Sequence, residues 1–188
     1  MAQSATTSEE VHQQVPAADR VSSQEVSKRL AVRGLSLPEP WRIPISPDVR
    51  IPAQLVRVVG SRVFISGHVP ISTDGQLTGP YGKIGDTVGL PSAQDAAVRT
   101  VLSMVASVER TVGDLSRVKA WCRLHCMANA VPGFFDFPAV FNPASQLLLD
   151  MFGEDIGYHA RVAVGVAGLP WDVPVEIAAE LELHPESE

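Results

Sequence analysis

Two charged residues in the last quarter of the chain, Arg161 and Glu176, have types and spacing that could support chemistry. Residues 159–183 alternate between apolar and other side chains with period two, which predicts two strands joined by a turn. In the first strand Val162, Val164 and Val166 are expected on the core face. Arg161 falls on its other face with Ala163 and Gly165, and Glu176 falls on the charged face of the second strand. An arginine can hold a carboxylate, and a glutamate can orient water and accept its proton.

The pair therefore predicts a small polar site on a sheet, with Arg161 and Glu176 on equivalent faces of their strands. Both side chains must reach one pocket, across either the hairpin or a subunit boundary. A placement on opposite faces of the sheet would count against a single site.

The composition is that of a globular protein: 188 residues, 45% hydrophobic and 19% charged, with a net charge of −6. This predicts one domain plus a tail. The chain has no Lys/Arg cluster typical of nucleic-acid binding and no apolar run of the roughly 18–20 residues that span a bilayer. Its N-terminus lacks the apolar segment of a secretion signal. We expect a cytoplasmic protein with no nucleic-acid or membrane partner.

Cysteine and histidine spacing predicts neither a disulfide nor a metal site. Cys122 and Cys126 stand four apart in a predicted strand, roughly 13 Å from each other, whereas a disulfide needs Cα atoms within about 7 Å. We expect two reduced, packed thiols. The five histidines are scattered along the chain, and no glycine-rich nucleotide motif is present, so no metal or cofactor is predicted.

The first 50 residues are predicted to be an extension of a compact domain over 51–184. Residues 1–24 are polar and predicted to be disordered. Ser22 or Ser23 is expected to cap a short helix over about 24–33, ended by Gly34. A proline-rich connector follows, with Trp41 as its expected anchor.

The strands of the domain follow from alternation and turn signals. A hairpin is predicted around Gly60–Ser61, followed by a Gly/Pro-rich loop over 70–91 that could close on a ligand. A strand over 115–127 is predicted to place Trp121 and His125 on its polar face. There they would line a pocket or pack against a loop or a second subunit.

Two helices are predicted between these strands. The first is expected to start at Ser92 as N-cap and to stop at Gly113. The second is expected to start at Asn142, with Pro143 in the first helical position, and to stop at Gly153. An amphipathic turn should precede it.

The resulting order is β-β-α-β-α-β-β, which favours an α+β fold with both helices on one face of a mixed sheet. The other face would then be bare in the monomer. Apolar and aromatic residues on such a face predict its burial by another subunit.

The chain resembles the RidA/YjgF family at several motifs, in the right order and spacing, over about residues 50–183. VFISGHVP is similar to the family's S-G-Q-x-P signature, with His68 in place of glutamine. The segments VGDLSRVKAW, AVFNPASQLLLDMFGE and HARVAVGVAGLPWDVPVEIAAEL resemble three further family motifs. The resemblance implies the homotrimeric fold shared with the small chorismate mutases, with three sheets around a central barrel and a cleft at each subunit interface.

The resemblance also implies a hydrolase acting on C=N bonds, an enamine/imine deaminase. Such enzymes convert 2-aminoacrylate-type intermediates to 2-keto acids and ammonia, without a cofactor. Arg161 matches the arginine that holds the substrate carboxylate, and Glu176 matches the carboxylate that orients water. Ser66 and Gly67 match the residues that line the pocket.

Further substrate contacts follow from the same matches. Asn142 corresponds to an asparagine at a helix start, and Ala163 stands where many members have a cysteine whose backbone carbonyl assists. Val162 and Phe137 complete the predicted contacts. His68 and His159 are interpreted as structural residues.

One departure from the family pattern leaves the function open. Many members carry a tyrosine early in the first strand, where this chain has Ala53, unless Tyr81 or Tyr158 substitutes from a loop. One alternative is therefore a non-catalytic regulatory trimer that binds a small carboxylate metabolite. Another is a related reaction on a larger substrate in a biosynthetic pathway. The RNA cleavage attached to some relatives is not favoured by this acidic chain.

Overall fold

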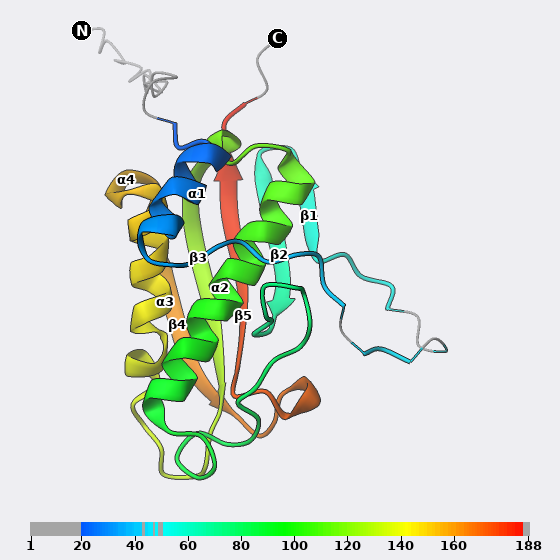
Figure 1. Cartoon of the computed structure of the whole chain (residues 1–188), viewed down its shortest axis with the longest axis vertical. Helices are drawn as coiled ribbons and strands as arrows, with labels where there is room; N and C mark the ends of the chain where they lie inside the picture. The colour runs from blue at the N-terminus through cyan, green and yellow to red at the C-terminus, as the bar shows by residue number, and fades with distance from the viewer. Residues whose placement is uncertain (1–19, 43, 47, 49–50, 186–188) are drawn as a thin grey trace, which may run out of the picture.

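The computed structural model describes residues 20–185 except 43, 47, 49 and 50. Its helices and strands form two layers, with the long helices in front of a mixed sheet in Figure 1. The strands are β1 (Val56–Val59), β2 (Arg62–His68), β3 (Val118–Asn129), β4 (Ala160–Val166) and β5 (Val175–Leu183). The helices are α1 (Ser23–Val32), α2 (Leu90–Val112), α3 (Phe137–Phe152) and α4 (Glu154–Gly157).

The sheet has the strand order β1-β2-β5-β3-β4, in which β3 and β4 run parallel and the other neighbours antiparallel. The predicted α+β class, the order β-β-α-β-α-β-β and the placement of the long helices on one face are confirmed. The β1–β2 hairpin turns at Gly60–Ser61 as expected. None of the described helices is long and apolar enough to cross a membrane.

Strand β5 shows the predicted alternation. Its core side carries Val175, Ile177 and Leu181, each at most 1% exposed, against the helices. Glu176 and Glu180 point to the opposite face and are partly exposed. We call this opposite side of the sheet the open face.

Strands β4 and β5 do not form a hairpin, because β3 lies between them. Arg161 is paired with Leu124, a core-facing residue, whereas Glu176 is paired with Met127 on the open face. Directly opposite residues share a face of the sheet. Arg161 therefore lies on the helix side and Glu176 on the open face, and the predicted equivalent faces are wrong.

Packing of α3 explains why the valines of β4 do not face the core. A Cβ on Gly165 would lie 2.5 Å from Cζ of Phe137, so the helix side of β4 has room for small residues only. Ala163, on that same side, packs against the core. Val162 and Val164 consequently point to the open face.

A β-bulge in β3 changes the alternation at its centre. Trp121 pairs with Leu181, but Arg123 pairs with Glu180, so Cys122 is an extra residue on β3. Trp121 is 1% exposed and belongs to the core, which contradicts its predicted place beside His125 on the polar face. Both cysteines are free as expected, although Cys122 is exposed rather than packed.

The start of α2 differs from the prediction at Ser92. The helix begins at Leu90, after Gly89, and Pro91 occupies its first turn without any side-chain cap. A proline in the first turn costs no hydrogen bond, because the N–H there has no helical partner. The predicted stop at Gly113 is confirmed, with φ of 88°.

The start of α3 was also predicted too late. The helix begins at Phe137, so Asn142 is not its N-cap and Pro143 lies inside it. An internal proline removes the hydrogen bond to the carbonyl four residues earlier, here that of Ala139. The side chain of Gln94 on α2 replaces it, with Nε2 donating to the Ala139 oxygen at 2.9 Å. The stop at Gly153 is confirmed.

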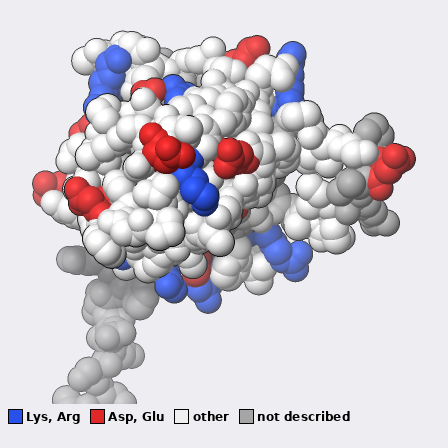
Figure 2. Space-filling view, turned by 90° about the horizontal axis from the view of Figure 1, so that it is seen from below, with Lys and Arg blue, Asp and Glu red and all other residues white. Residues whose placement is uncertain are grey.

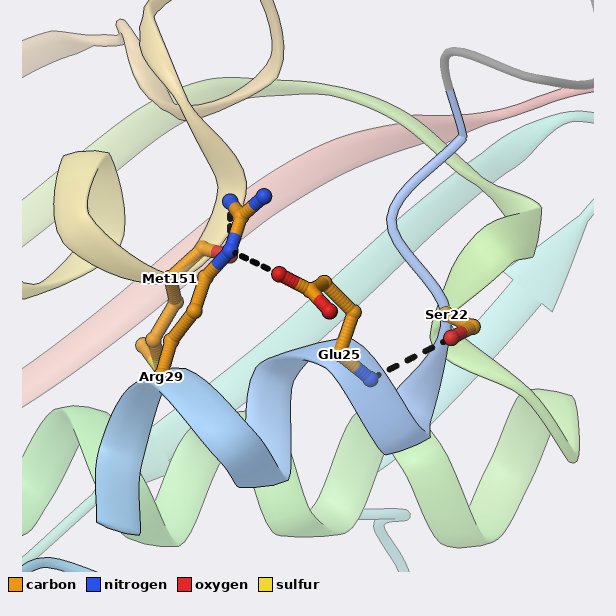
Figure 3. Close-up of polar contacts among 4 residues, drawn as sticks. All are labelled: Ser22, Glu25, Arg29 and Met151. Atoms are coloured by element: carbon orange, nitrogen blue, oxygen red, sulfur yellow. Dashed lines mark hydrogen bonds and ion pairs between the residues drawn. The ribbon is translucent and has the colours of Figure 1, made fainter. Parts of the chain in front are cut away.

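Helix α1 brings part of the N-terminal extension into the core. Ser22 caps it by accepting from the Glu25 amide at 3.2 Å, and Val26 and Leu30 are fully buried. Arg29 donates to Glu25 and to the carbonyl of Met151 in the last turn of α3 (Figure 3).

The predicted disorder concerns a segment of which the structure describes only the end. Residues 1–19 lie outside the described residues, while 20–24 are folded and contradict the prediction. The boundary near residue 50 between extension and domain stays a prediction.

Candidate active site

A cleft of about 380 Å³ lies at the open-face side of β2 and β5, next to the proline-rich connector. It brings together Ser66, Gly67 and Glu176, three of the residues predicted to form the site. The other lining residues are mostly apolar and come from the connector and from the turn before β5. They are Trp41, Ile45, Ile51, Ala53, Gln54, Leu55, Val69, Pro170 and Trp171.

A β-bulge shapes the floor of this cleft. Ile65 pairs with Ala179 and His68 with Ile177, so Ser66 and Gly67 together face one residue of β5. A Cβ on Gly67 would lie 1.7 Å from Oε1 of Glu176. Glycine at this position therefore leaves the space that the carboxylate occupies.

Glu176 has no hydrogen-bond or ion-pair partner among the described residues. Burial raises the pKa of its carboxyl above the ordinary value of 4.5. A carboxylate that is poorly hydrated and unpaired is a suitable general base at neutral pH. Nearby, the Ser66 hydroxyl donates to the Gln54 carbonyl at 2.7 Å and keeps its lone pairs available.

The walls of the cleft expose large apolar side chains. Ile51 is 54% exposed, and Ile45, Leu55 and Trp171 are 37–39% exposed. Apolar residues gathered around one carboxylate mark a place that a ligand or another protein surface covers.

The turn that carries Trp171 has an unusual backbone. Trp171 and Asp172 both have positive φ, 53° and 56°, a region that residues with a Cβ seldom occupy. Buried Asn129 holds the turn, since its Nδ2 donates to Oδ1 of Asp172 at 3.0 Å. The Gly82 amide donates to the Asp172 carbonyl at 2.7 Å.

His68 lies buried behind the cleft, and burial lowers its pKa to about 4. Its neutral ring donates from Nδ1 to the Ser66 carbonyl at 2.7 Å and packs edge-on against Trp41. Trp41 in turn donates from Nε1 to Ser103 on α2 at 2.6 Å, which confirms its predicted role as the anchor of the connector.

Arg161 lies in a second cluster, between β4 and α3. Its Nη2 donates to Oδ1 of Asn142 and its Nη1 to Oγ of Ser145, both at 2.9 Å. In the described part of the chain, no carboxylate oxygen lies within 4.0 Å of the guanidinium. The arginine is thus oriented by neutral groups, and its charge is not neutralised.

The remaining predicted contacts divide between the two sides of β4. Ala163 and Phe137 lie on the helix side with Arg161, where Phe137 covers Gly165. Val162, on the open face, pairs with His125 and does not belong to this cluster.

One chain therefore holds the predicted site in two halves. Ser66, Gly67 and Glu176 form the cleft half, and Arg161 with Asn142 forms the arginine half. The halves lie on opposite faces of the sheet and toward different edges, with β4 as the edge strand of the arginine half. A shared pocket across a hairpin is excluded, and within one chain the halves do not meet.

The tyrosine expected from the family pattern has no counterpart in the cleft. Ala53 does line the cleft, as the position predicts. Tyr81 instead donates to the Leu77 carbonyl, and Tyr158 is 61% exposed. Neither tyrosine is among the residues that line the cleft of one chain.

Sequence reasoning missed Trp171, Ser145 and His159. His159 stands two residues before Arg161, and Ser145 three after Asn142, spacings that place side chains on one side of a strand or helix. The backbone of Trp171 had no sequence signal.

Charged side chains are spread over the end of the molecule that is lowest in Figure 1. Figure 2 shows this face, where side chains of both signs are scattered among neutral ones and some of opposite sign lie next to each other.

Comparison with known proteins agrees with this architecture. Residues 27–179 match the family described as "YjgF/chorismate_mutase-like, putative endoribonuclease". Protein TCP17 of Trypanosoma cruzi is 38% identical over 125 residues, which are 66% of this chain and 77% of that protein.

Two solved structures are also similar. Atu1372 of Agrobacterium tumefaciens, described as of unknown function, is 31% identical with a TM-score of 0.75, covering 86% of this chain and 93% of that one. A protein of Shewanella oneidensis, described as a putative endoribonuclease, is 27% identical with a TM-score of 0.73, covering 84% and 99%. Because the family model spans most of the chain and the fold agrees, the protein belongs to the YjgF family.

Proposed function

We propose that the protein is an enamine/imine deaminase whose active site forms between neighbouring copies in a homotrimer. Its substrate would be a small carboxylate metabolite of the 2-aminoacrylate type, in the cytoplasm, and its products a 2-keto acid and ammonia. The observation that carries the proposal is the carboxyl of Glu176, half-buried in an apolar cleft against Gly67 with a raised pKa.

The division of the site supports its assembly between copies. In a ring, each copy presents one surface to a different surface of the next copy. Arg161 lies on edge strand β4, while the cleft lies toward the edge formed by β1 and β2. The exposed apolar walls of the cleft and the unneutralised guanidinium are both features that a neighbour and a bound carboxylate would cover.

The chemistry needs little beyond orientation and one proton relay. Arg161 holds the substrate carboxylate and thereby places the C=N carbon beside Glu176 of the neighbour. Protonation of the enamine at its terminal carbon gives an iminium ion. Glu176 then takes a proton from water as the water oxygen bonds to the iminium carbon. Glu176 returns this proton to nitrogen, the C–N bond breaks and ammonia leaves, and loss of the hydroxyl proton gives the 2-keto acid.

The test is release of 2-keto acid by the purified protein, coupled to a serine/threonine dehydratase that supplies the unstable intermediate. We expect acceleration over spontaneous hydrolysis at micromolar protein, lost in Arg161→Ala and in Glu176→Gln. The matched control is Gln146→Ala, a change at an exposed residue of α3 outside both halves. No acceleration by the wild-type protein would overturn the proposal.

A second candidate, a regulatory trimer that binds a carboxylate without turnover, is favoured by Ala53. This residue lines the cleft at the position of the family's tyrosine and brings no hydroxyl. Thermal stabilisation by 2-ketobutyrate that Arg161→Ala abolishes, together with absent turnover, would select this candidate. Faster hydrolysis of bulky than of small imines would instead select the related reaction on a larger substrate.

A further inference from the structure

Arg161 belongs to a chain of hydrogen bonds that continues beyond the groups it contacts. Its Nη1 donates to Ser145 at 2.9 Å, and the Ser145 hydroxyl lies 3.0 Å from Nε2 of His159. Nδ1 of the same ring lies 2.7 Å from the carbonyl of Gly157. We infer that Ser145 and His159 are positioning residues that hold the Arg161 guanidinium in place for the substrate carboxylate. This inference rests on the carboxylate-binding role proposed for Arg161.

The direction of every bond in the chain is fixed by chemistry. A guanidinium only donates, so the Ser145 oxygen accepts from it, and the Gly157 carbonyl only accepts. His159 must therefore donate from Nδ1, which leaves Nε2 as an acceptor for the Ser145 hydroxyl. Of the two neutral tautomers of His159, these hydrogen bonds select the one with its proton on Nδ1.

The surroundings of His159 keep the ring neutral. Burial lowers its pKa, and the positive charge of Arg161 lowers it further, while the bond to Gly157 acts in the opposite sense. The carboxylates on the packed elements α3 and α4 are Asp150, Glu154 and Asp155, and none of them hydrogen-bonds the ring.

Protonation of Nε2 would turn the ring into a second donor facing Ser145. The Ser145 oxygen has two lone pairs and would then accept from both the ring and the guanidinium, while its own O–H would lose the His159 acceptor. A protonated ring would also place a second positive charge beside Arg161, so the guanidinium would be held less firmly.

The hydrogen bonds to Arg161 also leave N–H donors of its guanidinium available to a ligand. Asn142 and Ser145 stand three apart on α3 and use one N–H each of Nη2 and Nη1. Arginine has five N–H donors, so about three remain for a carboxylate. The network thus fixes the plane of the guanidinium and leaves its other N–H donors available to a ligand.

The kinetic test compares Ser145→Ala with Ser145→Thr, which keeps the hydroxyl, and His159→Ala with His159→Gln. Binding of the substrate carboxylate contributes equally before and during the reaction, so its loss raises KM rather than lowering kcat. We expect KM to rise about tenfold in the two alanine variants, the effect of one lost hydrogen bond. Ser145→Thr should restore most of the loss, and Gln146→Ala should equal wild type.

A second measurement does not depend on turnover. Nitrogen NMR of the wild-type protein should show His159 protonated on Nδ1 at pH 7, and Ser145→Ala should mix the two ring tautomers and mobilise the Arg161 side chain. Protonation on Nε2, or an Arg161 signal unchanged by Ser145→Ala, would overturn the inference whether or not the protein is an enzyme. The expected NMR result with no turnover would leave the positioning role in place and overturn the deaminase proposal.

Discussion

The two halves of the candidate site differ in how their charged groups are held. In the cleft half, Glu176 stands among apolar walls with no described partner, and burial raises the pKa of its carboxyl. In the arginine half, Arg161 has partners on α3 that are all neutral. A base is strengthened when partners are withheld, whereas an arginine is made selective when its orientation is fixed. The first half depends on backbone shape, and the second on a side-chain network.

The largest effect is expected from Glu176→Gln, which removes the carboxylate of the cleft half. We expect deaminase activity to fall at least a hundredfold, the usual contribution of a general base. At pH values above 7, the variant with the neutral amide should also have a higher Tm than the wild-type protein. The folded pKa of Glu176 lies above its unfolded value, so its contribution to stability is present below pH 4.5 and is lost as pH rises through the folded pKa.

The control for this variant is Glu180→Gln. Glu180 lies on the same face of β5 but forms an ion pair with Arg62 at 2.8 Å. We expect unchanged activity and no gain in Tm. A stabilisation equal to that of Glu176→Gln would show that position 176 is not special.

Mixing two inactive variants tests whether the halves meet between copies. Arg161→Ala and Glu176→Gln each spoil one half, but an interface between an intact arginine half and an intact cleft half remains functional. After subunit exchange in equal amounts, about a quarter of the interfaces should be intact, since each half is intact in half of the chains. Activity that stays at the level of the unmixed variants would contradict an intersubunit site, and light scattering should give the mass of a trimer.

Gly67→Ala tests the shape of the cleft half alone. The new Cβ would meet the carboxylate end of Glu176, a flexible group that can move aside. We expect activity to fall about tenfold to a hundredfold through misplacement of the carboxylate, with a stability change within about 1 kcal/mol. Gly168→Ala is the matched control, because a Cβ there has no atom within 4 Å. Equal activity in the two variants would argue against a role for the cleft.

The smallest effect is expected at the strained turn. Asp172→Gly relieves the positive φ but removes the carboxylate that accepts from Asn129, so the two effects on unfolding free energy should nearly cancel. Trp171 should become more mobile, and KM should rise about twofold to threefold. Asp172→Asn keeps an oxygen acceptor and tolerates positive φ, so it should behave like wild type. An equal KM change in both variants would show that the conformation of the turn does not affect substrate binding.

Local patterns predicted much of the fold, and long-range packing decided the rest. The alternation of β5 and the turn at Gly60–Ser61 were predicted because each depends on neighbouring residues. The core face of β4 was predicted wrongly, since it is set by Phe137 covering Gly165. The bulge beside Trp121 likewise depends on its pairing with β5.

The same distinction holds for the candidate site. The meeting of Ser66, Gly67 and Glu176 in one cleft agrees with their sequence motifs. The separation of Arg161 from them could not be predicted, because it follows from β3 lying between β4 and β5. A motif reports which residues are present, whereas strand order determines which of them can meet in one chain.

Pro143 has a mechanical consequence for the arginine half. A proline within a helix normally weakens it, because one carbonyl loses its hydrogen bond. Here the carbonyl of Ala139 accepts from Gln94 of α2, so the lost bond is replaced by one that links α2 to α3. Asn142 and Ser145, the two residues that orient the guanidinium, follow Ala139 on α3 by three and six residues. A shift of α3 along α2 would thus change the orientation of Arg161, so the packing of the two helices fixes the position of the charge that we propose to bind the substrate.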